Sequence, residues 1–261
     1  MTLVNGVRIL WLSKAFSSGN RLTLLQARLM SQKAAVTHCI FDFDGLLVDT
    51  EKCYTIANRT MLRKFGREFT PELNELIMGR KEDDAFPLLF KAVGIEGKIT
   101  LEEYIAQYDI LLYDMFPKCQ AMPGAEKLVR HLSKKEIPMA ICSGSREVTF
   151  GPREKPHKDW LDLIKLKFFC GDEPSVKRGK PYPDPYIATM NRFSEKPSDS
   201  SKVLVFEDAP NGGRAAKAAG MKCVMVPDVK FRKEALSIGV TQVLNSLEDF
   251  RPEDFGLPPF D

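Results

Sequence analysis

Short apolar runs alternate with longer stretches of helical pattern along most of this chain, and this alternation constrains its fold more than any other feature. The runs lie at residues 36–41, 137–142, 166–170, 203–206 and 223–226, with a weaker one at 242–244. Helical patterns separate them at 125–135, 184–192 and 211–219. Continuous apolar runs are typical of strands covered on both faces, as in parallel sheets. The alternation therefore predicts an α/β protein with a doubly wound, Rossmann-like core on a parallel sheet.

One interval, after the first apolar run, contains no convincing strand. It holds four helical candidates at 54–65, 71–78, 82–93 and 101–116, with glycines between them. Ligands of open α/β sheets bind beyond the carboxyl ends of the strands. An insert that leaves the first strand at its carboxyl end is therefore expected to cover the site like a lid. We expect a core formed by residues 36–52 and 122–261, and an all-helical cap domain formed by residues 53–121.

The N-terminal stretch differs from the rest of the chain in charge. No acidic residue precedes Asp42, although five cations do: Arg8, Lys14, Arg21, Arg28 and Lys33. A segment rich in Arg, Ser, Thr and Leu and free of carboxylates has the composition of a mitochondrial transit peptide. The reading we favour is a disordered tail or an extension upstream of a start at Met30. We expect a cytoplasmic protein, or a mitochondrial one if residues 1–35 act as a transit peptide.

Composition excludes several classes of protein. Of the 261 residues 44% are hydrophobic, which is enough for a sizeable core, and no apolar run is long enough to span a membrane. The net charge of +3 is too balanced to argue for a nucleic-acid partner. The six cysteines form no CxxC pair, which argues against a zinc site and a disulfide framework. We expect a monomer with no nucleic-acid or membrane partner.

Two acidic pairs follow apolar runs directly. Asp42 and Asp44 come after the first run, and Glu207 and Asp208 follow the run at 203–206. Such carboxylates are costly at the end of a buried strand unless a cation compensates them. Two acidic strand ends that meet at one sheet edge form an oxygen-rich site that suits Mg²⁺. The alternative is that these acids cap the helices that follow.

Hydroxyl and basic partners follow two further runs. Ser143, Gly144 and Ser145 come after the second run, where a hydroxyl and exposed backbone N–H groups at a helix start can bind an anion. Lys180 follows the third run and can supply a positive point charge. Because these residues stand at successive strand ends, a role in binding is favoured over a chance occurrence in loops.

These residues resemble the four motifs of the haloacid dehalogenase-like hydrolase superfamily. The motifs are DFDGLLVDT at 42–50, Ser143, Lys180 and Glu207–Asp208, in the order of that superfamily. The helical insert stands where the superfamily has its first type of cap, and the resemblance covers about residues 36–260. The blocks MPGAEKL at 122–128, VFEDAPNG at 205–212 and LNSLEDF at 244–250 are similar to the pseudouridine-5′-phosphatase group and the related glycerol-3-phosphate phosphatases. They do not separate these two substrates.

The resemblance implies a mechanism with two catalytic carboxylates. Asp42 is expected to attack the phosphorus and form an aspartyl-phosphate. Asp44 is expected to protonate the leaving alkoxide and then to take a proton from the hydrolytic water.

The resemblance also implies a cofactor and its ligands. Mg²⁺ is expected on the side chains of Asp42 and Asp208 and the main-chain carbonyl of Asp44, with Glu207 acting through water. Ser143 and Lys180 are expected to hold the phosphoryl oxygens, beside the backbone of Gly144.

Two further residues leave alternatives open. Thr50 is expected either to bind substrate or to shape the hinge that leads into the cap, and we favour the hinge. Arg80, next to Gly79 and Lys81, reaches a phosphate or sugar hydroxyl, or else belongs to an exposed helix start. The loop at 150–157 contains two prolines and a glycine, which limit the helix expected there and make substrate preference less certain.

The sequence therefore predicts a Mg²⁺-dependent phosphomonoesterase for a small soluble phosphate ester. Pseudouridine 5′-phosphate is the first choice, and glycerol 3-phosphate or a sugar phosphate is the alternative. A mutase of the β-phosphoglucomutase kind and a non-catalytic binding protein rank lower, because nothing marks protection of the aspartyl-phosphate from water and no key acid is missing.

Overall fold

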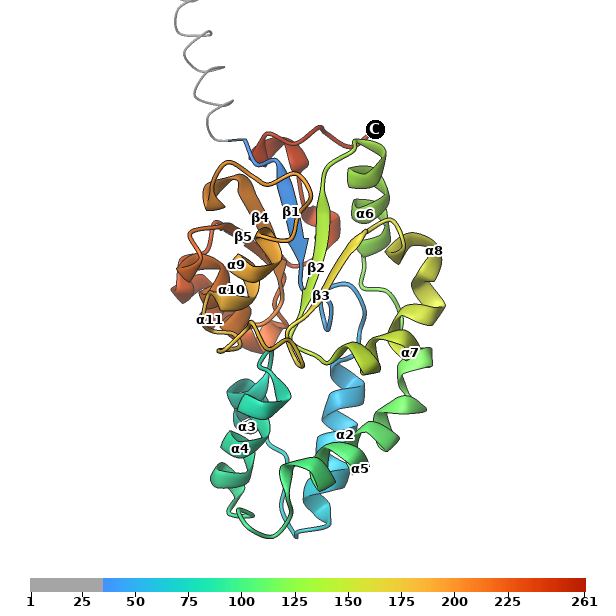
Figure 1. Ribbon diagram of the computed structural model, residues 1–261, viewed down its shortest axis with the longest axis vertical. Helices are drawn as coiled ribbons and strands as arrows, with labels where there is room; N and C mark the ends of the chain where they lie inside the picture. Colours follow the sequence, from blue (N-terminus) through green and yellow to red (C-terminus); the bar gives the residue numbers. More distant parts are fainter. Residues whose placement is uncertain (1–34) are drawn as a thin grey trace, which may run out of the picture.

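A parallel sheet of six strands forms the centre of the molecule (Figure 1). The computed structural model describes residues 35–261, so the leader expected at 1–35 lies, except for Ala35, outside the described residues. The strand order is β3-β2-β1-β4-β5-β6, and every pairing is parallel. The strands are β1 (His38–Phe41), β2 (Met139–Ser143), β3 (Leu166–Phe169), β4 (Val203–Glu207), β5 (Lys222–Met225) and β6 (Gln242–Val243). The predicted α/β class is confirmed.

The first strand begins later than its apolar run predicts. The backbone N–H of Val36 donates to the carbonyl of Phe255 at 3.0 Å, and that of Thr37 donates to the carbonyl of Lys202 at 2.8 Å. Both acceptors lie outside the strands, so the sheet ladder starts only at His38. Apolar character alone does not distinguish a residue paired in the sheet from one paired beside it.

Helices cover both faces of the sheet. Helices α6 (Ala125–Lys134) and α8 (Lys158–Leu161) lie on one side, while α9 (Asp184–Met190), α10 (Pro210–Ala218) and α11 (Arg232–Ile238) lie on the other (Figure 1). Successive residues of β1 alternate between two apolar cores, as strand geometry requires. Cys39 and Phe41 belong to the cluster that includes Leu128 of α6, whereas Ile40 packs with Tyr186 of α9. None of the described helices is long and apolar enough to cross a membrane.

The four predicted helices between the first two strands are present. They are α2 (Glu51–Arg63), α3 (Pro71–Ile77), α4 (Glu82–Val93) and α5 (Leu101–Tyr113), and they lie beyond the carboxyl ends of the strands (Figure 1). The side chains of Thr70 and Thr100 accept N-cap hydrogen bonds at the starts of α3 and α5. Helix α5 ends before the predicted residue 116, and the chain passes into a 3₁₀ turn (Phe116–Lys118) at Pro117. The division at residues 53–121 into cap and core stays a prediction.

The two chain segments that join the cap to the core lie side by side. The backbone N–H of Asp49 donates to the carbonyl of Gln120, and that of Met122 donates to the carbonyl of Leu47, both at 2.9 Å. These bonds fix where the helices leave the sheet, so the cap stands over the end of β1.

The loop after β2 forms only short helical pieces. Helix α7 (Phe150–Glu154), a 3₁₀ turn (Lys155–His157) and α8 follow one another, as the prolines of this segment predict. This segment carries Arg153, which the site requires.

Candidate active site

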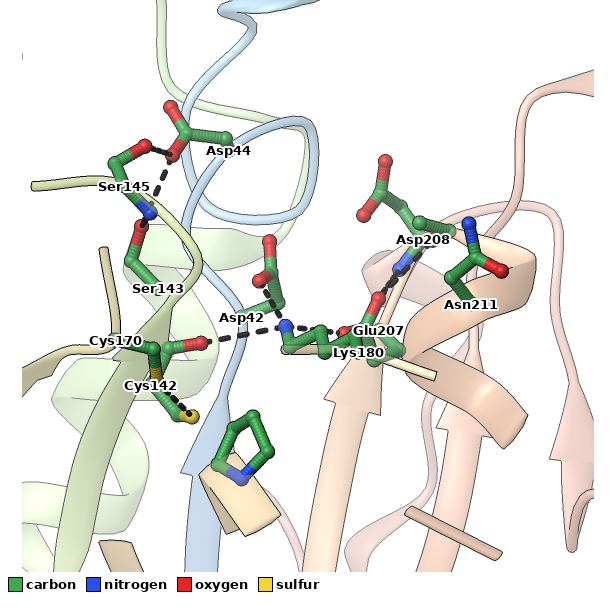
Figure 2. Close-up of polar contacts among 12 residues, drawn as sticks. Asp42, Asp44, Cys142, Ser143, Ser145, Cys170, Lys180, Glu207, Asp208 and Asn211 are labelled. Atoms are coloured by element: carbon green, nitrogen blue, oxygen red, sulfur yellow. Dashed lines mark hydrogen bonds and ion pairs between the residues drawn. The ribbon is translucent and has the colours of Figure 1, made fainter. Parts of the chain in front are cut away.

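Three carboxylates meet where β1 and β4 end. Phe41 stands opposite Phe206 in the sheet register, so the following residues, Asp42 and Glu207, reach the same edge, and Asp208 comes next. Carboxylate oxygens of Asp42, Glu207 and Asp208 all lie within 4.8 Å of one another. Figure 2 shows the ammonium group of Lys180 between Asp42 and Glu207, with Asp208 farther from it. The two acidic strand ends thus form one buried acidic cluster.

Lys180 bridges two members of this cluster. Its Nζ donates to Asp42 Oδ1 at 2.5 Å and to Glu207 Oε1 at 2.6 Å (Figure 2). Only 2% of the residue is exposed. Burial opposes protonation, but the two carboxylates hold the pKa of Lys180 well above its usual value. Lys180 therefore remains charged and offsets part of the acidic cluster.

Glu207 is held by four donors and faces inward. Besides Lys180, the hydroxyl of Tyr186 donates to Oε1 at 2.5 Å. The backbone N–H groups of Asp208 and Ala209 both donate to Oε2 at 3.1 Å. Glu207 is fully buried, and its hydrogen bond with Lys180 holds the ammonium group beside Asp42.

No ion pair within 4.0 Å joins Asp208 to a cation of the described residues, although the charge of Lys180 acts to lower its pKa. Its Oδ1 is buried and finds no hydrogen-bond partner among the described residues. Burial, with Asp42 and Glu207 close by, holds the pKa of Asp208 well above its usual value. A buried carboxylate of this kind destabilises the fold unless a positive charge compensates it. An all-oxygen donor set suits a hard divalent cation, so the residues present fit Mg²⁺.

Gly45 allows the first loop to approach Asp208. Its φ of +85° lies in the left-handed region, and a Cβ there would overlap Asp208 Oδ2. Any side chain at position 45 would thus displace a carboxylate of the acidic cluster.

Asp44 points away from Asp42 (Figure 2), and both of its carboxylate oxygens accept hydrogen bonds. Arg153 Nη1 lies 2.6 Å from each oxygen. Thr50 and Tyr54 donate to Oδ1 at 2.9 and 3.0 Å, and Ser145 donates to Oδ2 at 3.0 Å. Burial would raise the pKa of Asp44, but Arg153 and these hydroxyls hold it below its usual value.

The loop after β2 brings hydroxyls and a glycine to the same place. Ser143 Oγ donates to Asp44 Oδ2 at 3.2 Å and accepts from the backbone N–H of Ser145 at 3.1 Å. Ser143 is fully buried, so the hydroxyl that faces the cavity described next is that of Ser145. A Cβ on Gly144 would lie 3.2 Å from the carbonyl oxygen of Arg80, which brings the cap close to this loop.

A cavity of about 100 Å³ opens above the acidic cluster. Residues of the core that line it include Asp42, Asp44, Gly144, Ser145 and Asp208, and Arg80 lines it from the cap. Thr50 does not line it; this residue is fully buried and donates to Asp44. Arg80 and Thr50 each had two interpretations from the sequence. In the structure Arg80 lines the cavity, whereas Thr50 holds Asp44, the candidate acid and base.

Several residues that hold or line the site were not predicted from the sequence, and two of them bind its acids. Arg153 is fully buried against Asp44, and Tyr186 holds Glu207. The unusual loop at 150–157 was a signal that something differs there, but nothing in it shows that Arg153 points inward. Tyr186 stands in an ordinary helical pattern that carries no signal.

Fold and site together define a class of enzyme. A parallel α/β core has a helical cap over a cavity lined by buried acids, one of which, Asp42, is paired with Lys180. This is a capped hydrolase with the arrangement of a phosphatase.

Comparison with known proteins gives the family. The sequence model of the haloacid dehalogenase-like hydrolase family matches residues 39–226. The chain is 40% identical to (DL)-glycerol-3-phosphatase 2 of Arabidopsis thaliana over 90% of its own length and 97% of that protein. It is also 40% identical to a probable pseudouridine-5′-phosphatase of Drosophila melanogaster, over 86% of its length and 96% of that protein. The chain belongs to the haloacid dehalogenase-like hydrolase family, and it is a phosphatase.

Solved structures agree on the fold. The structure of CbbY from Rhodobacter sphaeroides in complex with phosphate matches with a TM-score of 0.71 at 19% identity, over 82% of this chain and 96% of that one.

Proposed function

We propose that this phosphatase is a Mg²⁺-dependent phosphomonoesterase that hydrolyses a small phosphate ester through an aspartyl-phosphate on Asp42. One observation carries the proposal: Asp42 lines the cavity while its carboxylate lies within 4.8 Å of those of Glu207 and Asp208 and beside Lys180. This combination supports both a nucleophile and the charges that a phosphoryl group needs.

The chemistry of the first step concerns the ester bond. Asp42 attacks the phosphorus, the bond from phosphorus to the ester oxygen breaks, and the leaving oxygen takes a proton from Asp44. Lys180, 2.5 Å from Asp42, reduces the repulsion between the nucleophile and the anionic phosphate.

The second step regenerates the enzyme. Asp44 takes a proton from water, the water oxygen bonds to phosphorus, and the acyl phosphate at Asp42 breaks to give inorganic phosphate. The lowered pKa of Asp44 favours its ionised form, which is the form that this step needs.

Mg²⁺ fits the acidic cluster. The side chains of Asp42 and Asp208 and the main-chain carbonyl of Asp44 would hold it, with Glu207 acting through water. When bound, the ion offsets negative charge and orients the phosphoryl oxygens.

Pseudouridine 5′-phosphate is the first substrate we propose, and glycerol 3-phosphate is the second. Relatives named for each are 40% identical over most of the chain. Measurement of kcat/KM on a panel of phosphate esters ranks the two.

Release of inorganic phosphate in the presence of Mg²⁺ tests the nucleophile. We expect Asp42→Asn to lose nearly all activity and Asp254→Asn, an exposed acid elsewhere, to keep it. Equal activity of Asp42→Asn and the unaltered protein would contradict the proposal.

The compartment depends on whether residues 1–35 act as a targeting leader. We propose a cytoplasmic enzyme, with mitochondria as the alternative because the leader is basic and lacks carboxylates. Imaging of residues 1–35 fused to a fluorescent protein distinguishes the two.

A further inference from the structure

The four helices between β1 and β2 contribute polar groups to the cavity as well as apolar walls. Glu51 and Tyr54 line it from α2, Asn74 from α3, Glu82 from α4 and Tyr108 from α5. These groups face the space above the acidic cluster, where the leaving group of a bound ester would lie. They are therefore the groups that can select a leaving group.

Most carboxylates that line this cavity are already compensated. Three have a cation within 2.6 Å, namely Asp42 with Lys180, Asp44 with Arg153 and Glu82 with Arg146. Asp208 belongs to the acidic cluster. Glu51 is the remaining one, and no ion pair between described residues within 4.0 Å includes it. Its carboxylate is thus available to a ligand.

Glu51 is positioned by neighbours on two sides. It is half-buried at the start of α2, where its Cγ lies 3.2 Å from the point at which a Cβ on Gly45 would stand. From α3, the side chain of Asn74, which is 8% exposed, lies close enough to act on the pKa of Glu51. Burial raises the pKa of Glu51 to about 7, although Lys230 and Asn74 act in the opposite direction. The site is thus unfavourable for additional negative charge.

Arg80 is the single cation among the described residues that line the cavity. Its Nε donates to the carbonyl of Leu76 at 2.8 Å, which holds the guanidinium group at the end of α3. Five carboxylates and one cation line the same space, so the wall disfavours a further negative charge.

We infer that Glu51, supported by Asn74, determines leaving-group specificity: it selects a neutral, hydroxylated leaving group and rejects one that carries a carboxylate. The inference rests on the proposed phosphatase function and deepens it. A hydroxyl donates a hydrogen bond to the Glu51 carboxylate, which a carboxylate on the substrate cannot do. An anionic leaving group would instead place two buried negative charges side by side.

Two esters that differ at one carbon test this inference. Glycerol 3-phosphate ends in CH₂OH where 3-phosphoglycerate ends in a carboxylate, and the rest of the molecule is shared. We would measure kcat/KM for both with Mg²⁺ at pH 8, above the pKa of Glu51, and use p-nitrophenyl phosphate to report general phosphatase activity. Where an ester is not turned over, its inhibition of p-nitrophenyl phosphate hydrolysis gives its affinity.

The unaltered enzyme should prefer glycerol 3-phosphate by about 10-fold or more. Glu51→Gln, which keeps the shape and removes the charge, should reduce this preference about 10-fold, mainly through better use of 3-phosphoglycerate. Glu96→Gln, an exposed acid of the cap region, should leave the preference unchanged.

Two results would overturn the inference in distinguishable ways. If p-nitrophenyl phosphate is still hydrolysed, an unchanged substrate preference in Glu51→Gln contradicts the role of Glu51. A preference for 3-phosphoglycerate that depends on Arg80 also contradicts it. Loss of hydrolysis of every ester by the unaltered protein contradicts the phosphatase proposal itself, and the specificity inference with it.

Discussion

The guanidinium group of Arg153, which is fully buried, lies 2.6 Å from both carboxylate oxygens of Asp44. Three aromatic rings surround this guanidinium, those of Phe43, Phe116 and Phe150, at 5.1 to 5.9 Å. Asp44, the proposed acid and base, is therefore held in an ion pair with Arg153, which belongs to the loop after β2. The ion pair favours ionised Asp44. The ionised form can take a proton from water in the second step, but it cannot donate a proton to the leaving oxygen in the first.

The two steps can be separated with Asp44→Asn. An aryl ester such as p-nitrophenyl phosphate needs no proton on its leaving group, but water still needs a base. We expect this variant to release about one equivalent of p-nitrophenolate in a rapid burst and then to turn over slowly, because the aspartyl-phosphate accumulates. With an alkyl ester no burst should occur. Stopped-flow absorbance and phosphate release measure these phases, and fast steady turnover of both esters would contradict the role of Asp44.

The same substitution should reduce stability in a pH-dependent way. Asp44→Asn leaves the buried Arg153 without its anion, which costs about 3 kcal/mol in the free energy of unfolding near pH 7. The pKa of Asp44 is lowered in the folded protein, so its contribution is present above the unfolded value near 4 and is lost as pH falls further. Urea unfolding without metal should show the difference between the two proteins shrink below about pH 4. A constant difference down to pH 2 would contradict this reading of the ion pair.

Asp208 should have opposite effects on stability with and without metal. Without metal, Asp208→Asn removes an uncompensated buried carboxylate, so the variant should melt at a higher temperature than the unaltered protein. With millimolar Mg²⁺, the unaltered protein should gain a few degrees while the variant gains almost nothing. Differential scanning calorimetry with chelator or Mg²⁺ measures both. Asp254→Asn serves as a control that keeps the Mg²⁺ response, and an equal response in Asp208→Asn would exclude this residue as a ligand.

Arg146 connects the core to two cap helices. Its guanidinium donates to Glu82 of α4 at 2.6 Å and to Asp109 of α5 at 2.5 Å. Arg146→Ala should loosen closure of the cap and raise KM about 5-fold or more, with a smaller effect on kcat. Arg146→Lys should recover part of the loss because it keeps the charge. Steady-state kinetics check both variants, and an unchanged KM in Arg146→Ala would show that these contacts do not hold the closed cap.

Much of the architecture could be predicted because local patterns determine it. The apolar runs identify the strands, since a parallel sheet buries both faces, and acids placed after β1 and β4 must meet when those strands are neighbours. The same logic brings Ser143 to that edge. The order of the four motifs along the chain then indicates the chemistry of a phosphatase.

Contacts of long side chains could not be predicted in the same way. Arg153 reaches Asp44 across 109 positions in the chain, and Arg146 reaches Glu82 across 64. Which of the two arginines in the loop after β2 reaches Asp44 depends on how α7 packs against Phe43, a tertiary contact with no local pattern. Thr50 likewise donates to Asp44 from outside the cavity, a contact that no local pattern shows.

Chemical trapping tests the nucleophile most directly. Enzyme in steady turnover with Mg²⁺ and glycerol 3-phosphate or pseudouridine 5′-phosphate is denatured rapidly and treated with borohydride, which reduces an aspartyl-phosphate to homoserine. Peptide mass spectrometry then locates the modified residue. We predict homoserine at position 42, and at no other aspartate. Homoserine at a different aspartate, or none at all in an enzyme that is releasing phosphate, would contradict the assignment of Asp42.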